Sequence, residues 1–303
     1  MCDKFHAYIR DDNHAHLMSY ILQSYREAWK CCLLNWRVLF LLYACNLAIA
    51  FVALGPFSNL VESVFGRSLM MGDFTSRFDY TAIIDMINEH GLSLNLSIAT
   101  CMSFFIVYTI WTIFYTGGIV EIVRHKNTRS STLLFWKGGA ELFFRYLRLT
   151  VYVLIIALLI LTIAALFFTK DGLNPLSMDS ESFLIRRFKL LGIIIIISYF
   201  LLALFRDIAK VAIGYEQPKY LITEPIRDAF VRTFTLRYII LGLLNLSVLG
   251  LGLLLYFLLK KFMDDVWAII IISQLFLIYR LAYRVVRLAS ISCLYDHMKK
   301  DKA

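Results

Sequence analysis

Six long apolar runs constrain the fold more than any other feature of this sequence. They cover residues 39–54, 92–123, 149–168, 183–205, 238–259 and a last run that begins at Val266. A run of about 20 apolar residues matches the hydrocarbon core of a bilayer, which is about 30 Å thick. These runs are too long and too uniform for the strands of a barrel, so each is predicted to be a transmembrane helix. The predicted fold class is an all-α, polytopic membrane bundle of six helices.

The composition supports the same class. Hydrophobic residues make up 60% of the 303 residues and charged residues 17%, against about 45–50% and about 25% in soluble domains. A formal net charge of +9 is typical of chains that bind nucleic acid or an anionic membrane surface. Because the basic residues lie beside apolar runs, the lipid bilayer is the predicted partner and nucleic acid is excluded.

The chain divides into three similar units between a polar tail, 1–16, and a charged tail, 299–303. The units are 17–124, 130–215 and 223–298, and together they form one six-helix domain, 17–298. In each unit an amphipathic basic segment precedes the first span, and the returning span ends in charged residues. All three units have the same orientation, so they form a parallel repeat of helical hairpins.

The third unit shows this arrangement most clearly. The stretch 223–257 begins as an Arg-bearing amphipathic segment and becomes apolar at Arg237, with no Pro or Gly between the halves. It is predicted to be one continuous helix that lies on the membrane surface and then enters the bilayer. On its surface half Asp228 and Arg232 share one face, while Ala229 and Phe230 lie on the other. Arg37 and Arg148 mark the same transition in the other units.

The connections between spans show where the loops lie. Gly55–Pro56 is predicted to end the first span. The outer loop 57–91 carries five acidic residues against two arginines and contains two short amphipathic patterns, which predict helices on the outer surface. The loop 169–182 also carries more acids than bases.

Lysine and arginine concentrate on the opposite side, in the N-terminal segment, 124–148, 206–237 and 280–302. Basic residues near the ends of spans remain in the cytoplasm. Both termini are therefore predicted to be cytoplasmic, in a multi-pass protein of a bacterial inner membrane.

Charged residues at the inner ends of the spans are the candidate functional residues. Five cations are predicted to contact lipid phosphates or an acidic partner protein: Arg145, Arg148, Lys210, Arg237 and Arg284. Glu121 and Asp207 form a candidate pair of carboxylates. The alternative is that these cations reach out to the headgroups and pair with Glu121, Glu141 and Asp207 without any specific ligand.

No catalytic, cofactor or metal site is predicted. The sequence lacks HExxH, GxSxG and Walker motifs, and its six cysteines show no CxxC spacing. No Asp, Glu, Lys or Arg lies near the centre of an apolar run, which disfavours an ion-coupled transporter.

Three functions stay open. The first is a non-enzymatic scaffold, assembly factor or lipid-interacting protein that contacts anionic headgroups or a membrane-protein partner. The second is a transporter or channel for a small or lipid-like solute, and the third is a membrane-embedded lipid-modifying enzyme. A cavity lined by charges at the inner ends of the spans would favour the second or third.

Four segments carry a resemblance to known proteins. WKGGAELFFRYLRL and PIRDAFVRTFTLRYI precede spans, and RDIAKVA and YRVVRLA follow them. In this architecture the chain resembles uncharacterised bacterial six-helix integral membrane proteins. It is also loosely similar to the membrane domain that accompanies some glycerophosphodiester phosphodiesterases. The resemblance implies a six-helix membrane domain and supplies no catalytic residue.

Overall fold

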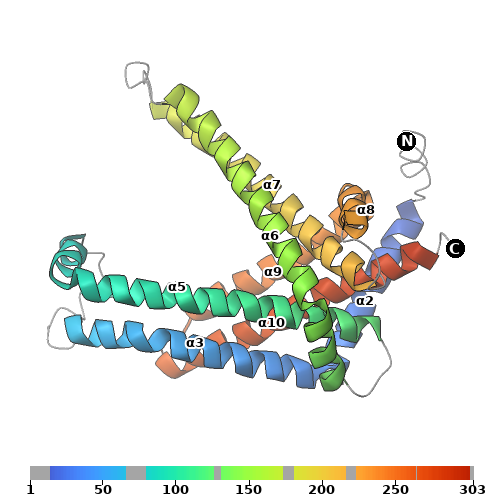
Figure 1. Ribbon diagram of the computed structural model, residues 1–303, viewed down its shortest axis with the longest axis horizontal. Coiled ribbons are helices and arrows are strands. Elements are labelled where there is room, and N and C mark those ends of the chain that lie inside the picture. The colour runs from blue at the N-terminus through green and yellow to red at the C-terminus, as the bar shows by residue number, and fades with distance from the viewer. Residues whose placement is uncertain are drawn as a thin grey trace. The chain divides into compact units, whose positions relative to one another are not determined.

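The structure, a computed structural model, is entirely helical over the residues that it describes, 14–65, 80–125, 131–172, 181–215, 223–263 and 265–300, apart from short turns. Figure 1 shows the helices in chain order: α2 (His14–Leu34), α3 (Trp36–Phe65), α5 (Tyr80–Arg124), α6 (Ser131–Gly172), α7 (Glu181–Tyr215), α8 (Thr223–Thr233), α9 (Leu236–Lys261) and α10 (Val266–Lys300). The predicted all-α fold class is confirmed.

Six of these helices contain a segment long and apolar enough to cross a membrane. The segments are Trp36–Gly55, Ile98–Arg124, Thr132–Ala164, Leu191–Tyr215, Leu236–Lys261 and Trp267–Lys299. Each overlaps one of the six runs predicted from the sequence, although the third begins at Thr132 instead of Leu149 and the fourth ends at Tyr215 instead of Phe205. The chain is therefore described below as a multi-pass membrane protein.

The chain packs as two units. One unit is Phe40–Thr112, which holds parts of α3 and α5; the other, called the main unit here, combines Met1–Leu39 with Ile113–Ala303. Inside the main unit α10 packs against α2, α7 and α9, and α7 also packs against α6 and α8. The pairs α6–α7 and α9–α10 are thus the helical hairpins predicted for the second and third sequence units.

The prediction of one continuous helix over 223–257 is wrong. Helix α8 ends at Thr233, and α9 begins at Leu236 after an extended residue, Thr235, with φ −78° and ψ 132°. The Thr-Phe-Thr sequence before Leu236 explains the break, because β-branched and aromatic residues are poor helix formers. The hydroxyl of Thr233 also donates to the carbonyl of Ala229 at 2.8 Å, a local bond that competes with helix continuation.

A second break lies at the matching place in the first unit. Asn35 separates α2 from α3, two residues before Arg37, as Thr235 lies two residues before Arg237. The amide of Asn35 donates to the carbonyl of Cys31 at 2.9 Å. In the middle unit the matching residue is Tyr146, and α6 continues through it without a break.

The first outer connection also differs from its prediction. Helix α3 continues through Gly55–Pro56 to Phe65 instead of ending there. On the far side α5 begins at Tyr80 and runs unbroken into the second span. Within 57–91, the described residues therefore extend the spanning helices, and residues 66–79 lie outside the described part of the chain.

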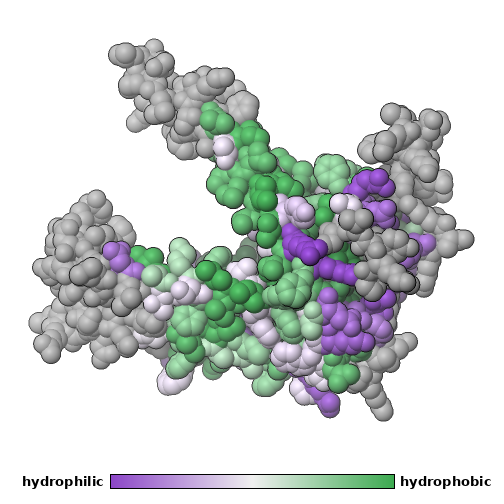
Figure 2. Space-filling view, in the orientation of Figure 1, coloured by the Kyte–Doolittle hydropathy of each residue, from purple (hydrophilic) through white to green (hydrophobic). Residues whose placement is uncertain are grey.

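The core of the main unit lies toward one end of its spans. Its buried residues include much of the last three turns of α7 and the last three turns of α10. We call this region the basic end: the last turns of α5, α7 and α10, the first turns of α6 and α9, and the helices α2 and α8. Away from it the spans are largely uncovered, since only 6% to 22% of the residues in their most apolar windows are buried. Figure 2 shows this contrast, with hydrophilic residues near α2, α8 and the end of α10.

The pattern of burial supports the repeat. The residue after each of the three matching arginines is buried, and these residues are Val38, Leu149 and Tyr238. The arginines themselves stay exposed or half-buried. Each unit thus has an exposed or half-buried arginine followed by a buried side chain at the predicted start of its apolar run.

Candidate functional site

A buried aspartate is the centre of the charged residues at the basic end. Asp207 lies on α7 and exposes 6% of its side chain. One of its carboxylate oxygens accepts from Nε of Arg206 at 3.3 Å, and the other pairs with Nη2 of Arg287 on α10. Arg287 also donates to the carbonyl of Ala203 at 3.4 Å. Both carboxylate oxygens are thus occupied by guanidinium groups, and the two helices are joined.

Lys210 lies one helical turn beyond Asp207 and is also buried. The hydroxyl of Tyr146 on α6 donates to the backbone carbonyl of Lys210 at 2.7 Å, which fixes this turn of α7. The charged groups that act on the Lys210 ammonium are Asp207, Arg206, Arg284 and Arg287. Lys210 and Arg284, both candidates from the sequence, are therefore brought together.

The remaining three candidate cations lie apart from Lys210. Arg148 is exposed, and Arg145 and Arg237 are half-buried. Arg145, Arg148 and Arg237 are not among the charged groups that act on Lys210. They lie beside the predicted starts of the third and fifth apolar runs, on α6 and α9, so the five predicted cations belong to two different places on the basic end.

The two candidate carboxylates also hold different cations. Glu121 on α5 pairs with Nη1 of Arg124 at 3.7 Å and lies 3.3 Å from Nδ1 of His125. Arg124 reaches further, to the carbonyl of Gly214 on α7 at 3.4 Å. Arg124, which pairs with Glu121 on the same helix, therefore links α5 to the end of α7, while Asp207 links α7 to α10.

A third ion pair was missed by the sequence analysis. Arg232 on α8 is buried and donates to Asp228 at 2.7 Å, and Asp228 also accepts from the hydroxyl of Tyr295 at 3.2 Å. The guanidinium lies 4.2 Å from the ring centre of Tyr295. Burial alone would lower the pKa of Arg232, but the neighbouring Tyr238, Asp228 and Tyr295 raise it.

The expectation for α8 is only partly confirmed. Ala229 is buried, as expected of the apolar face, but Arg232 of the charged face is buried as well, and Phe230, expected on the packed apolar face, exposes 58% of its surface. The sequence contained a signal for the burial of Arg232. An Asp–Arg pair at i, i+4 on a helix beside a membrane can pack against the protein, while aromatic residues of the same helix contact lipid.

Four glycines allow α5 and α6 to cross closely at the basic end. A Cβ added to Gly117 would lie 2.9 Å from the carbonyl oxygen of Gly138, and one added to Gly139 would lie 2.7 Å from the ring of Phe114. Gly118 contacts Phe135 in the same crossing. Backbones approach this closely only where side chains are absent, so these glycines fix the place of Glu121 against α6.

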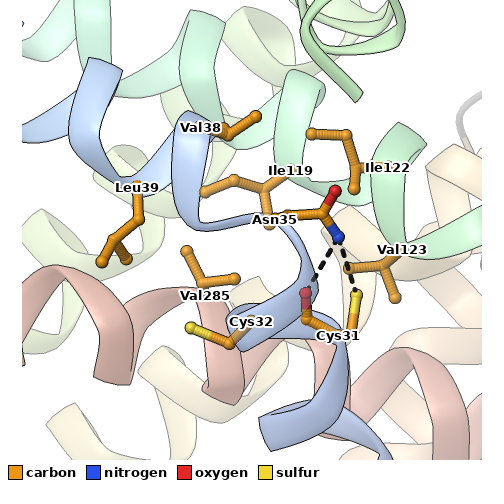
Figure 3. A pocket seen from close by; sticks show the side chains of 9 residues that line it. All are labelled: Cys31, Cys32, Asn35, Val38, Leu39, Ile119, Ile122, Val123 and Val285. Carbon is orange, nitrogen blue, oxygen red and sulfur yellow. Dashed lines mark hydrogen bonds between the residues drawn. The ribbon is translucent and has the colours of Figure 1, made fainter. Parts of the chain in front are cut away.

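A pocket beside this region is apolar and small. It is lined by residues of α2, α3, α5 and α10: Cys31, Cys32, Asn35, Val38, Leu39, Ile119, Ile122, Val123 and Val285 (Figure 3). Its cavity volume is about 10 Å³, about what a single water molecule needs. Burial raises the pKa of the Cys32 thiol to about 11, with a smaller contribution from Cys31.

The charged residues do not line this pocket, and among the described residues no group of three His, Cys, Asp or Glu side chains is placed to hold a metal ion. The chemistry that the basic end offers is electrostatic. Its cations outnumber its carboxylates, and Asp207, Glu121 and Asp228 are already paired.

No family model, curated protein or solved structure matches this chain. The proposals below therefore rest on the fold and on the packing of the basic end.

Proposed function

We propose that this is a non-enzymatic protein of a bacterial inner membrane that binds anionic lipid headgroups through its basic end, as a scaffold or assembly factor. The observation that carries the proposal recurs at the predicted starts of three apolar runs. In each unit, a bulky aromatic side chain is exposed near the arginine that is followed by a buried residue, Val38, Leu149 or Tyr238. The pairs are Trp36 with Arg37, Phe144 with Arg148, and Phe234 with Arg237.

Exposed aromatic and leucine side chains beside arginines are typical of the membrane interface. The apolar part enters the boundary of the acyl chains, and the charge reaches the phosphates. Trp36 exposes 61% of its surface, and its ring centre lies 6.0 Å from the guanidinium carbon of Arg37. We call α2, residues 131–148 of α6, and α8 the collars, and we infer that they lie at the level of the headgroups.

The sign of the charge supports the cytoplasmic side for the collars and for both termini. Basic residues near spans remain inside, and the cytoplasmic leaflet carries a negative surface potential that attracts them by about 1 kcal/mol for each residue. A partner protein with an acidic face would meet the same surface.

The test compares thermal stability in nanodiscs of phosphatidylglycerol with that in nanodiscs of phosphatidylcholine. We expect the wild-type protein to unfold at a higher temperature in phosphatidylglycerol, and we expect salt to reduce the difference because exposed charges are screened. The double variant Arg148→Gln/Arg237→Gln should lose about half of the difference.

The control is Lys261→Gln/Asp265→Asn at the other end of α9, which removes one charge of each sign. The net charge at that end is unchanged, so the control should keep the wild-type difference. Equal stability in the two lipids, together with no crosslinked partner in native membranes, would contradict the proposal.

A further inference from the structure

The strongest unexplained feature of the main unit is an excess of positive charge between α7 and α10. Arg206, Asp207 and Lys210 lie on one side of α7, and Arg284 and Arg287 lie one turn apart on α10. Four cations thus surround one carboxylate. Inside a membrane protein such an excess is costly unless an anion compensates it.

The carboxylate cannot compensate all of them. Both oxygens of Asp207 are occupied by Arg206 and Arg287. In the part of the chain that the structure describes, the ammonium of Lys210 has no hydrogen-bond or ion-pair partner. Lys210 is nevertheless only 6% exposed, so it is a buried cation that shares the nearby carboxylate of Asp207 with Arg206 and Arg287.

Arg284 lies beside Lys210 without a carboxylate of its own in the described residues. Its guanidinium carbon lies 4.7 Å from the ring centre of Tyr115 on α5. Stacking on an aromatic face leaves the edge of a guanidinium free to donate to a phosphate in a bidentate manner. Arg206 exposes 36% of its side chain, which leaves a route by which an anion can approach.

The depth of these residues matches that of lipid phosphates. Lys210 lies about 29 Å along α7 from Leu191, the start of that span, and Arg284 about 26 Å along α10 from Trp267. Both distances are close to the thickness of the hydrocarbon core, about 30 Å. Counted from the starts of these candidate spans, the two cations lie at similar distances along their helices, as a place near the headgroups requires.

We infer that Lys210 and Arg284, with Arg206 beside them, bind one phosphate group between α7 and α10. Three positively charged side chains suit a phosphomonoester, which carries more negative charge than a phosphodiester. The phosphate comes either from a lipid headgroup or from a soluble phosphate compound, and the depth favours the lipid. The site is separate from the collar arginines on which the proposed function rests, although it extends the same lipid interaction to a single bound headgroup.

Native mass spectrometry of the full-length protein in a neutral detergent tests this site. The probes are phosphatidic acid, phosphatidylcholine and inorganic phosphate, each added alone. We expect one phosphatidic acid per chain to bind at least about tenfold more tightly than phosphatidylcholine. Lys210→Met should lose about tenfold or more of that affinity, the range of a charged hydrogen bond. Lys210→Arg should keep it, and the control Lys260→Met should equal the wild type.

Thermal unfolding without added lipid separates a binding role from a structural one. Lys210→Met removes a buried charge that has no partner, so its unfolding temperature should equal or exceed that of the wild type. A lower unfolding temperature in Lys210→Met that Lys210→Arg does not restore would assign Lys210 to structure and would overturn the inference.

The other outcomes also decide between possibilities. Binding of inorganic phosphate without phosphatidic acid, when lost in Lys210→Met, supports the site and assigns it to soluble phosphates. Equal affinity of wild type and Lys210→Met for phosphatidic acid overturns it. The variant Arg148→Gln/Arg237→Gln should keep the single tight phosphatidic acid while it loses the preference for phosphatidylglycerol nanodiscs, so the site and the proposed function can fail independently.

Discussion

At the scale of single residues, the basic end contains charged side chains that form ion pairs and others that do not. Asp207 holds two guanidinium groups, and Glu121 holds Arg124 and His125. Removing one partner of a buried pair leaves the other charge buried without compensation, which costs more than the pair itself contributes. These carboxylates therefore act as links between helices.

The variant Asp207→Asn tests this role. It should lower the stability by about 3 kcal/mol, the low end of the range for buried pairs because Arg206 and Arg287 are partly exposed. Differential scanning fluorimetry in detergent measures the change. The control is Glu141→Gln, which breaks the exposed pair with Lys137 at 3.8 Å and should cost about 0–1 kcal/mol. Equal losses in the two variants would show that Asp207 does not link α7 to α10.

The neighbouring cysteines Cys31 and Cys32 give a second prediction. The pKa of Cys32 is raised from 9.0 to about 11, so its thiolate fraction near pH 7 is about 100-fold below that of an ordinary thiol. Single-cysteine variants treated with N-ethylmaleimide should react slowly at Cys32 and faster at the half-buried Cys31. The Cys32 rate should rise as the pH approaches 11, and denaturant should remove the difference. Equal rates in the folded protein would contradict the burial of Cys32.

The sequence predicted the residues of the basic end better than their partners. Lys210 and Arg284 were candidates because they are basic and flank apolar runs, and they do lie together. Arg206 and Arg287 were noted only as charges at the ends of spans, because nothing in a single sequence shows which arginine across a helix pair faces Asp207. Arg232 was placed on the outer face of α8, since amphipathic analysis assumes that charge faces water.

At the scale of helices, the glycines of α5 and α6 let the two backbones approach closely. A Cβ on Gly117 would lie 2.9 Å from the carbonyl oxygen of Gly138 and 3.2 Å from Cα of Gly139. Both neighbours are backbone atoms, so a methyl group cannot be accommodated by a change of side-chain rotamer.

Gly117→Ala should therefore lower the stability by about 1–3 kcal/mol, as overpacking does. The matched control is Gly250→Ala on α9, where an added Cβ meets no atom within 4 Å. The control should be neutral or more stable by up to about 1 kcal/mol, because alanine has the higher helix propensity. Thermal unfolding of both variants checks this, and the result would count against the crossing if Gly117→Ala behaved like the control.

The spans were predictable because apolar length and flanking charge decide them; α9, for example, extends only two residues beyond the predicted run at either end. The breaks at Asn35 and Thr235 were not predicted because hydropathy carries no information on local backbone bonds. The sequence marks these breaks only weakly. Asn35 precedes Arg37 by two residues, and the Thr-Phe-Thr sequence ends two residues before Arg237. In the middle unit α6 continues through the matching residue, Tyr146, whose hydroxyl donates to the carbonyl of Lys210.

At the scale of the whole molecule, the buried core of the main unit and the excess of basic residues coincide at one end of the spans. The rest of each span is covered by few residues of this chain, which is the condition expected of helices that lipid surrounds. The basic end is thus the most firmly packed part of the main unit and also the part that we infer to contact headgroups.

The measurement that tests this account most directly uses the α9–α10 hairpin. Two single-cysteine variants, Lys261→Cys and Lys299→Cys, place thiols at exposed positions near its two ends, in a background without the native cysteines. A maleimide that cannot cross membranes is added to spheroplasts or to inverted inner-membrane vesicles. The account predicts that residue 261 is labelled in spheroplasts and residue 299 in inverted vesicles. Labelling of both residues from one side, or the reverse of this pattern, would contradict it.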